Sequence, residues 1–288
     1  MSAEENQSIR SAPCASATQH TESDGAVTVT AGENFDWLIV CDHASNAIPR
    51  SFHDLGLDCA AIQYHIAWDV GASQVARRLA LRLKAPLIES GHSRLLIDCN
   101  RYPQAADSIV TVSDGHVVRG NFGLTPEQRR DRRDAFFRPY HLAIEQALSG
   151  AELLGHIPVF VSVHTCTASM AGRARPWDVC ISWTRDQRVA RPVLEGLSGL
   201  QGVKVGDNLP YALEIGIDFT TPEHAMVRGL AHLQFELRQD RVSTADAAQE
   251  WGDRLFEVLL AARRAATWHR RWHVLTSADK VQGAAKWL

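Results

Sequence analysis

From Trp37 onward, short apolar runs alternate with longer amphipathic stretches, and this alternation constrains the fold more than any other feature of the sequence. Apolar runs of this length suit strands that are buried on both faces. Amphipathic stretches between them suit helices that return the chain across the sheet. The alternation therefore predicts a three-layer α/β fold: a mixed, mostly parallel sheet with helices on both faces.

Six apolar runs are the strand candidates: 37–41 (WLIVC), 85–89 (APLIE), 94–99 (RLLIDC), 158–163 (PVFVSV), 178–183 (DVCISW) and 233–237 (LQFEL). The helix candidates cover about 70–83, 126–148, 187–198 and 244–270. The second helix has a clear start, since Thr125 can be its N-cap, Pro126 suits its first position and Gln128 completes a capping box.

The first 33 residues are rich in Ser, Ala, Thr and Glu and show little apolar periodicity. We expect residues 1–33 to form a disordered or loosely packed leader. Residues 34–288 contain no repeat and no linker, so we expect one domain. Two long polar segments, 101–124 and 165–177, are predicted loops of the kind that carry sites on α/β folds.

The charge balance argues against a polyanionic partner. Lys and Arg number 30 against 33 Asp and Glu, which gives a net charge of -3. A chain of this charge has no strong basic field to hold nucleic acid or an anionic membrane, so we expect neither as a partner. The N-terminus lacks the apolar segment of a secretory signal, and no apolar run is long enough for a membrane span.

The six cysteines are scattered singly and form no CxxC pair, which favours a reducing compartment. We therefore expect a cytoplasmic protein.

Titratable residues follow several of the predicted strands at their carboxyl ends, where open α/β sheets gather ligands. The run 37–41 leads directly into Asp42-His43, and the run 158–163 leads into His164. Each histidine alone is more often a hydrogen-bonded strand-end residue. Their shared placement favours a common metal ion, because two imidazoles leave room for a carboxylate and a water molecule on zinc.

A third ligand has to come from another segment. Asp69 lies just before the helix predicted at 70–83, where it could be a ligand or only the helix N-cap. We predict that Asp69 is the ligand. Glu89, at the end of another apolar run, is the reserve candidate.

Two arginines flank the run 94–99. Arg101 with Asn100 forms a candidate anchor for an acidic substrate, because the planar guanidinium binds a carboxylate at two points. Arg94 could polarise the scissile carbonyl as a catalytic residue. The structural alternative is that these arginines only pair with Asp98 or Asp107.

Glu236 is embedded in the apolar run 233–237. A carboxylate there is costly to bury unless it is paired, bound to metal or facing a cavity. Pairing with Arg238 is disfavoured, because the side chains of adjacent strand residues point to opposite faces. We predict that Glu236 is the general base, which takes a proton from the attacking water and delivers it to the leaving amine.

Five segments together, CDHASNAIP, HIAWDVGA, SRLLIDCNR, VSVHT and LQFEL, resemble the N-formylglutamate amidohydrolase family over about residues 36–260. The resemblance implies a phosphorylase/hydrolase-like fold similar to zinc carboxypeptidases and acyl-amino-acid deacylases. It implies that His43 and His164 are metal ligands, that Asn100 and Arg101 grip the substrate carboxylate and that Glu236 is catalytic.

One departure concerns the metal. The carboxypeptidase pattern is His-x-x-Glu, whereas Asn46 stands three residues after His43 here. Asparagine is a poor zinc ligand, so we expect Asp69 to replace the carboxylate. The resulting hypothesis is a zinc-dependent hydrolase that cleaves the amide bond of a small acidic N-formyl or N-acyl amino acid with metal-activated water.

Three other functions remain open from the sequence. One is a zinc amidase or carboxypeptidase acting on a peptide or cell-wall fragment. Another is a metal-free protein that binds a small acid, which Asn46 keeps possible. The third, a cysteine hydrolase using Cys41 or Cys166, is disfavoured because neither thiol has a clear third catalytic partner.

Overall fold

The computed structural model describes residues 25–263 and 268–272. A seven-stranded sheet runs through the molecule in the order β1-β3-β2-β6-β11-β9-β10. Its strands are β1 (Val27–Thr30), β2 (Trp37–Cys41), β3 (Leu87–Ser90), β6 (Val159–Cys166), β9 (Val179–Ser182), β10 (Val205–Asp207) and β11 (His232–Arg238).

The four central strands β3, β2, β6 and β11 are parallel, so their carboxyl ends share one edge. The outer strands reverse direction: β1 is antiparallel to β3, and β9 is antiparallel to β11. This mixed, mostly parallel sheet confirms the predicted α/β fold class.

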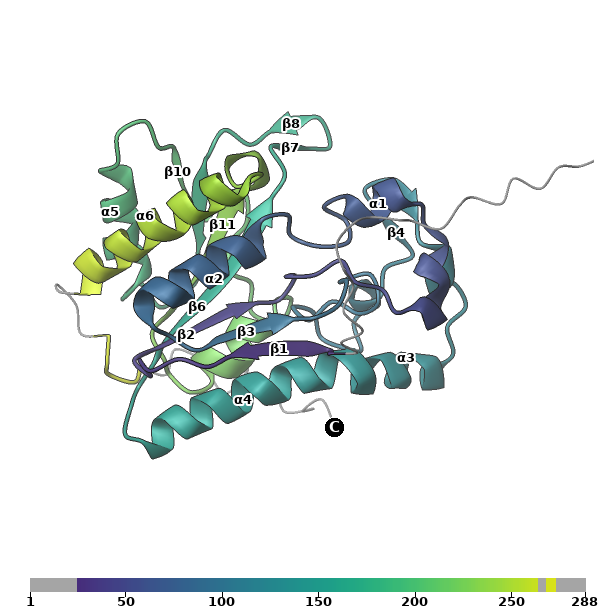
Figure 1. The fold of residues 1–288 in the computed structure, drawn as a ribbon, viewed down its shortest axis with the longest axis horizontal. Coiled ribbons are helices and arrows are strands. Elements are labelled where there is room, and N and C mark those ends of the chain that lie inside the picture. Colours follow the sequence, from purple (N-terminus) through teal and green to yellow (C-terminus); the bar gives the residue numbers. More distant parts are fainter. Residues whose placement is uncertain (1–24, 264–267, 273–288) are drawn as a thin grey trace, which may run out of the picture.

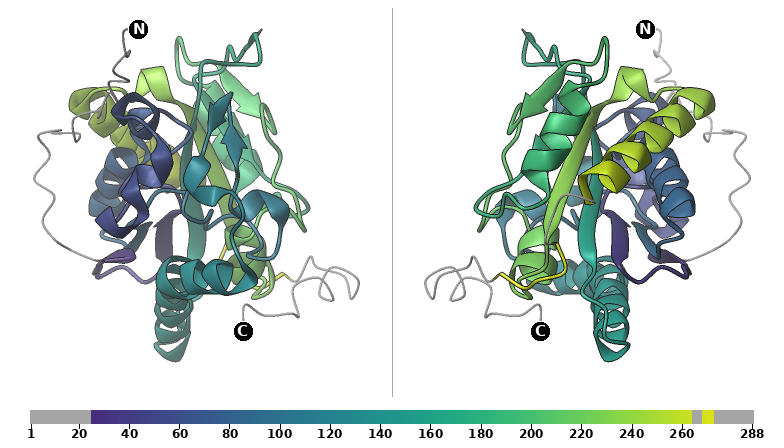
Figure 2. Two further views of the ribbon diagram at one scale, coloured as in Figure 1. Left: turned by 90° about the vertical axis from the view of Figure 1, so that its right-hand side faces the viewer. Right: turned by 90° about the vertical axis from the view of Figure 1, so that its left-hand side faces the viewer.

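Helices cover both faces of the sheet (Figures 1 and 2). On one face lie α2 (Ala72–Leu83), α5 (Ala190–Ser198) and α6 (Ala245–Arg263). They pack on inward-facing strand residues such as Ile39, Val161 and Phe235. On the other face α4 (Arg138–Leu153) packs Tyr140 and Ile144 against the alternate residues of the same strands. The period of two along each strand thus creates two separate apolar cores.

The helix predicted at 126–148 is longer and interrupted. Thr125, Pro126 and Gln128 form the expected start with a complete capping box. The helical path runs through α3 (Pro126–Arg132), a π-helical segment at Arg133–Phe137 and then α4. The last predicted helix ends as α6 at Arg263, and part of its predicted range, 264–267, lies outside the described residues.

The strand predicted at 94–99 is wrong. These residues form successive turns, one of which has Leu96 N–H donating to Ser93 O, and Asp98 N–H donates across to Ser108 O. The run is apolar because Leu95 and Leu96 fill a small core of their own, beside Leu55 and Ile66. The apolar residues of this run are buried as predicted, but they are buried under loops and not in the sheet.

The two predicted loop segments carry small elements. The hairpin of β4 (Val112–Ser113) and β5 (His116–Val117) lies in the first segment, and that of β7 (Ser169–Met170) and β8 (Arg173–Ala174) in the second. The short helix α1 (Cys59–Gln63) stands near β4 (Figure 1). Within the described residues, no helix is both long and apolar enough to cross a membrane.

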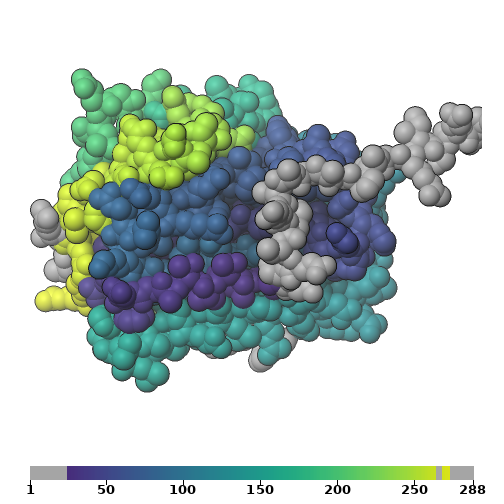
Figure 3. Space-filling model, in the orientation of Figure 1, coloured from purple at the N-terminus to yellow at the C-terminus, as the bar shows by residue number. Residues whose placement is uncertain are grey.

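The N-terminal segment also differs from expectation. We expected 1–33 to be a loose leader, but β1 lies within it and pairs with β3 along four residues. Residues 1–24 of that segment lie outside the described part of the chain. Figure 3 shows β1 as a purple strip at the surface between α2 and α4.

Candidate active site

Two histidines and an aspartate converge at the carboxyl edge of the central strands. His43 follows β2, His164 lies near the end of β6, and Asp69 precedes α2. The Nδ1 atoms of His43 and His164 lie 3.3 Å and 2.8 Å from the same oxygen, Oδ2 of Asp69. One ligand atom from each residue lies within 4.8 Å of the other two, a spacing that could hold a metal ion. The structure thus brings together the three predicted ligands.

Asp69 is not the side-chain N-cap of α2. The N-cap position is Gly71, which has φ of 84° and no side chain to donate or accept. The carboxylate of Asp69 instead faces the Nδ1 atoms of both imidazoles and accepts from the backbone N–H of Thr165. Its backbone is fixed by a bond from Asp69 N–H to His43 O, which ties the two ligand segments together.

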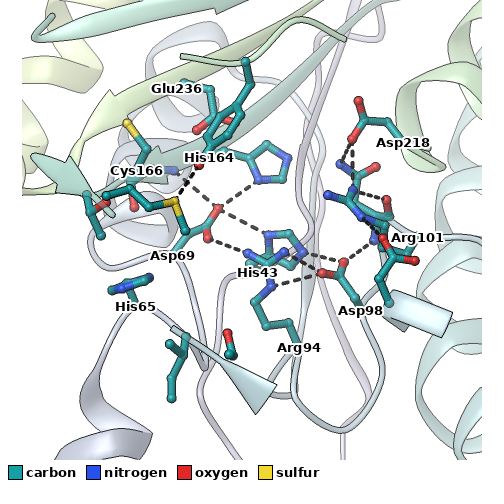
Figure 4. A pocket seen from close by; sticks show the side chains of 18 of the residues that line it. His43, His65, Asp69, Arg94, Asp98, Arg101, His164, Cys166, Asp218 and Glu236 are labelled. Atoms are coloured by element: carbon teal, nitrogen blue, oxygen red, sulfur yellow. Dashed lines mark hydrogen bonds and ion pairs between the residues drawn. The ribbon is translucent and has the colours of Figure 1, made fainter. Parts of the chain in front are cut away.

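The outer nitrogen of each imidazole meets another carboxylate. His43 Nε2 lies 2.7 Å from Asp98 Oδ1, and His164 Nε2 lies 2.9 Å from Asp42 Oδ2. Donation of Nε2–H to these carboxylates leaves the Nδ1 lone pairs directed at the centre of the cluster, the arrangement by which outer partners orient metal-binding histidines. Figure 4 shows the rings of His43 and His164 both directed at the carboxylate of Asp69.

Asp42 and Asp98 are themselves held in place. Asp42 accepts from Tyr140 Oη and Thr220 Oγ1 at 2.8 Å and 2.6 Å, and Asp98 accepts from Arg94 Nε at 3.0 Å. Sequence reasoning missed the role of Asp42, although it directly precedes His43 at the strand end. No sequence signal points to Tyr140 or Thr220, which reach Asp42 from distant segments.

The electrostatics of the cluster favour positive charge. Burial alone would lower the pKa of His164, but hydrogen bonds to Asp42 and Asp69 outweigh burial and hold that pKa well above its usual value. Burial would raise the pKa of Asp42, yet its hydrogen bond to His164 lowers it to about 2. Ionised carboxylates around two imidazoles therefore create a site for cationic species.

Glu236 faces the same pocket. Its neighbours Phe235 and Leu237 point into the core under α2 and α6, so Glu236 points to the opposite side of β11. It is in register with His164 on β6, and Gln234 Nε2 donates to its Oε1 at 3.0 Å. Burial raises the pKa of Glu236 to about 7, with the nearby charge of His164 acting in the opposite direction. The carboxyl group is thus poised between its two protonation states near neutral pH.

The predicted arginines also line the pocket, and both carry ion pairs. Arg94 binds Asp98 through Nε and Nη2 and lies 3.5 Å from Asp69 Oδ1. Arg101 contacts Asp107 and Asp218, each at 3.1 Å. The pairings with Asp98 and Asp107 that the sequence left as alternatives are therefore both present.

Asn100 is buried behind Arg101. Its side-chain oxygen accepts from the backbone N–H groups of Phe219 and Thr220, and its amide nitrogen donates to Asp218. These contacts position the loop that carries Arg101 and Asp218.

The reserve ligands lie elsewhere. Glu89 accepts from Ser73 and forms an ion pair with Arg77, and Asn46 donates to the backbone oxygen of Ile62. Neither belongs to the cluster of His43, Asp69 and His164.

The two cysteines considered as nucleophiles are buried, and burial is the main reason why the pKa of each is raised. A thiol of raised pKa is a poor nucleophile because little thiolate forms. This environment disfavours the cysteine-hydrolase alternative.

The pocket around these residues has a volume of about 350 Å³. Its walls come from the loop after β2, the 94–101 turns, the ends of β6 and β11 and the segment 211–218. Such a volume is at the lower end of the usual range for small-molecule sites. The mixed sheet carries a histidine–aspartate cluster and a buried glutamate at one edge. This combination is typical of the class of α/β hydrolytic enzymes.

Within that class, the chain belongs to the N-formylglutamate amidohydrolase family, whose model matches residues 35–242. The family assignment confirms the resemblance seen in the sequence and identifies the protein as an amidohydrolase. No curated protein sequence matches the chain.

Solved structures similar to this chain include two that share its fold. The gene product Atu2144 from Agrobacterium tumefaciens is 33% identical, with a TM-score of 0.80, and the match covers 85% of this chain and 98% of that one. The N-formylglutamate amidohydrolase from Ralstonia eutropha JMP134 is 18% identical, with a TM-score of 0.55, covering 83% and 99% of the two chains. The second likeness shows the shared fold.

Proposed function

We propose that this amidohydrolase uses one divalent metal ion, zinc, to hydrolyse the amide bond of a small N-formyl or N-acyl amino acid. The observation that carries the proposal is the convergence of His43, Asp69 and His164 in the pocket that Glu236 also faces. Two imidazole nitrogens and one carboxylate oxygen are the donor set of many catalytic zinc sites. The small volume of the pocket supports a single N-acyl amino acid rather than a long peptide.

The residues fit such an ion. Both Nδ1 atoms are aimed at one oxygen of Asp69, while Asp42 and Asp98 take the outer N–H groups. When bound, the ion would supply Lewis acidity, which lowers the pKa of a water molecule and polarises a carbonyl group. The preference of the cluster for positive charge supports a cation at this place.

Glu236 is the proposed general base and acid. A carboxyl group whose pKa lies near 7 accepts a proton from water and returns it to an amine leaving group with little energetic cost in either direction. Its burial keeps bulk water away, and Gln234 fixes its Oε1, so the second oxygen is left to face the pocket. Glu236 would thus carry the proton from the attacking water to the nitrogen of the scissile amide.

The arginines would bind the polar ends of the substrate. Arg94 is held against Asp98 and Asp69, so it could stabilise negative charge that develops on the carbonyl oxygen. Arg101 uses Nε and Nη1 for its carboxylate and backbone partners. Its Nη2 donates to none of the described residues and would bind a substrate carboxylate, with Asn100 positioning the loop.

The test is metal-dependent hydrolysis. The purified protein should contain zinc by elemental analysis, lose hydrolysis of N-formyl-L-glutamate on treatment with a chelator and regain it when zinc is added back. Glu236→Gln should reduce kcat by orders of magnitude while the metal content stays constant. Glu195→Gln, on the exposed surface of α5, is the matched control. Activity that persists without metal, or in Glu236→Gln, would contradict the proposed mechanism.

A comparison of substrates tests the other hydrolase hypothesis. Short peptides should be hydrolysed much more slowly than N-formyl and N-acyl amino acids, because the pocket volume suits one residue. Faster hydrolysis of peptides would instead favour an amidase or carboxypeptidase. Tight binding of a small acid without any metal or turnover would favour the binding-protein hypothesis.

A further inference from the structure

The pocket extends past the proposed metal ligands on the side away from Arg101. Figure 4 shows Arg101 and Asp218 on one side of these ligands, and Cys166 and His65 on the other. All four residues line the same pocket. In the proposed function Arg101 takes the carboxylate of the amine half, and the scissile amide lies beside the ligands. The acyl half of the substrate therefore lies on the side of Cys166 and His65.

Two large apolar side chains open onto this acyl side. Met170 of β7 and Tyr211 both line the pocket, and each is 41% exposed. Both contact the guanidinium of Arg175, which also donates to Thr167 Oγ1 at 3.1 Å, one residue along the chain from Cys166. Apolar surface that is exposed at the mouth of a pocket is available to an apolar part of the ligand.

Arg175 holds these two side chains in place. Its guanidinium carbon lies 4.8 Å from the centroid of the Tyr211 ring, and it donates to Tyr211 Oη and, at 3.1 Å, to Met170 Sδ. Tyr211 Oη in turn lies 3.6 Å from Met170 Sδ. Met170 and Tyr211, which we call the acyl-side wall, are thus oriented before a ligand arrives, and this lowers the entropy cost of binding.

The charge of Arg175 is less accessible than the wall that it supports. Arg175 also lines the pocket, but it is 9% exposed against 41% for Met170 and for Tyr211. A ligand on the acyl side would therefore meet mainly a thioether and an aromatic ring. Both are apolar groups that gain from contact with a hydrocarbon chain.

We propose that the acyl-side wall binds an apolar acyl group, so that the pocket accepts N-acyl amino acids whose acyl chain is longer than formyl. The proposal rests on the proposed function and names the acyl part of its substrate. A formyl group has only a hydrogen atom on its carbonyl carbon and would leave the acyl side unfilled. A chain of about four carbon atoms would reach the wall, and each methylene group buried there strengthens binding roughly 4-fold.

The first experiment varies the acyl group and keeps the amine half constant. It measures kcat/KM of the zinc-loaded wild type for N-acetyl-, N-propanoyl- and N-butanoyl-L-glutamate, whose carbonyl groups have similar intrinsic reactivity. We expect kcat/KM to rise roughly 3- to 4-fold with each added methylene group. A constant or falling kcat/KM along the series would overturn the proposal.

A fourth compound separates an apolar from a charged acyl group. N-succinyl-L-glutamate has the same carbon chain as the butanoyl compound but ends in a carboxylate. We expect the butanoyl compound to be hydrolysed faster, because a carboxylate loses hydration against the wall. Equal or faster hydrolysis of the succinyl compound would overturn the proposal, since it would assign the selection to the charge of Arg175.

Variants of Met170 locate the effect. Met170→Ala should lower the ratio of kcat/KM for butanoyl over acetyl roughly 3-fold or more, whereas Met170→Leu keeps the apolar bulk and should keep the ratio. Leu81→Ala, exposed on α2 outside the pocket, controls for the loss of an apolar side chain. Ile217, which lines the pocket beside Asp218, provides a control on the amine side, and Ile217→Ala should keep the ratio. The wild-type ratio in folded Met170→Ala would overturn the proposal.

A binding measurement distinguishes failure of this proposal from failure of the proposed function. Calorimetric titration of zinc-loaded Glu236→Gln with N-acetyl- and N-butanoyl-L-glutamate needs no turnover. The butanoyl compound should bind roughly 10-fold more tightly, and the double variant with Met170→Ala should lose most of that difference. If the wild type hydrolyses none of the compounds, the proposed function fails, and the same titration of the wild type still tests the wall. Equal affinities for the two compounds would overturn the proposal.

Discussion

His43 Nε2 lies 2.7 Å from Asp98 Oδ1, and the same aspartate forms an ion pair with Arg94. Asp98, held by Arg94, therefore orients the imidazole of His43, and the Nδ1 atom of His43 points toward Asp69. Asp42 performs the same function for His164 on the other side of the cluster. The geometry of the cluster thus depends on two aspartates that do not belong to the proposed ligand set.

Removal of a proposed ligand should remove the metal. We expect Asp69→Ala and His164→Ala to contain almost no zinc after purification, because two remaining ligands seldom hold the ion. Glu89→Gln and Asn46→Ala should keep a full complement of zinc, since both residues lie outside the cluster. Elemental analysis of the four proteins is the measurement. Zinc retained by Asp69→Ala but lost from Glu89→Gln would show that the ligand set is wrong.

Neutralisation of an outer aspartate should weaken zinc without abolishing it. We expect Asp98→Asn and Asp42→Asn to lower zinc affinity roughly 10- to 100-fold, the usual effect of losing an orienting partner. Competition with a chelator of known affinity measures this change. Asp253→Asn, on α6 and paired with Arg78, is the control for general charge loss. Equal affinities in Asp98→Asn and Asp253→Asn would argue against an orienting role.

The buried carboxyl of Glu236 should make metal-free protein less stable as the pH rises. Its pKa is about 7 in the folded protein against 4.5 normally, so the folded state holds the proton more tightly than the unfolded state does. The resulting stability is fully present below pH 4.5 and is lost as the pH rises through 7. Its upper limit is on the order of 3 kcal/mol.

Unfolding by urea between pH 4.5 and 8 tests this effect. We expect the free energy of unfolding of Glu236→Gln to exceed that of the wild type by a margin that grows with pH, because glutamine never ionises. Both metal-free proteins share all other titrating groups, so their difference isolates Glu236. Parallel curves over the whole range would exclude the raised pKa.

The start of α3 should contribute measurably to stability. Thr125→Ala removes the side-chain acceptor for Gln128 N–H and should destabilise the protein by about 1 kcal/mol. Thr125→Ser retains the hydroxyl and should remain close to the wild type. Urea unfolding at constant pH provides the comparison, and equal losses in both variants would mean that the hydroxyl is not the cause.

The central strands could be predicted because burial on both faces leaves a plain signature in the sequence. The run around Ile39 is wholly apolar, those around Val161 and Phe235 are mostly so, and the parallel pairing of these strands brings their carboxyl ends to one edge. The proximity of His43, His164 and Glu236 followed from that rule. Asp69 lies beside these residues because its backbone N–H donates a hydrogen bond to His43 O.

Other features could not be read from the chain. The run 94–99 is as apolar as a strand, since packing under loops and packing in a sheet require the same residue types. Tyr140 and Thr220 carry no local signal, because each contacts Asp42 from a segment far away in the sequence. Such properties exist only after folding.

The strand β1 has a consequence for solubility. It caps the outer side of β3, and its own residues are largely exposed (Figure 3). A chain shortened to begin at residue 34 would uncover the backbone N–H and C=O groups of β3, and bare strand edges recruit strands from other molecules. The segment whose composition is that of a loose leader therefore shields the edge of β3 from other molecules.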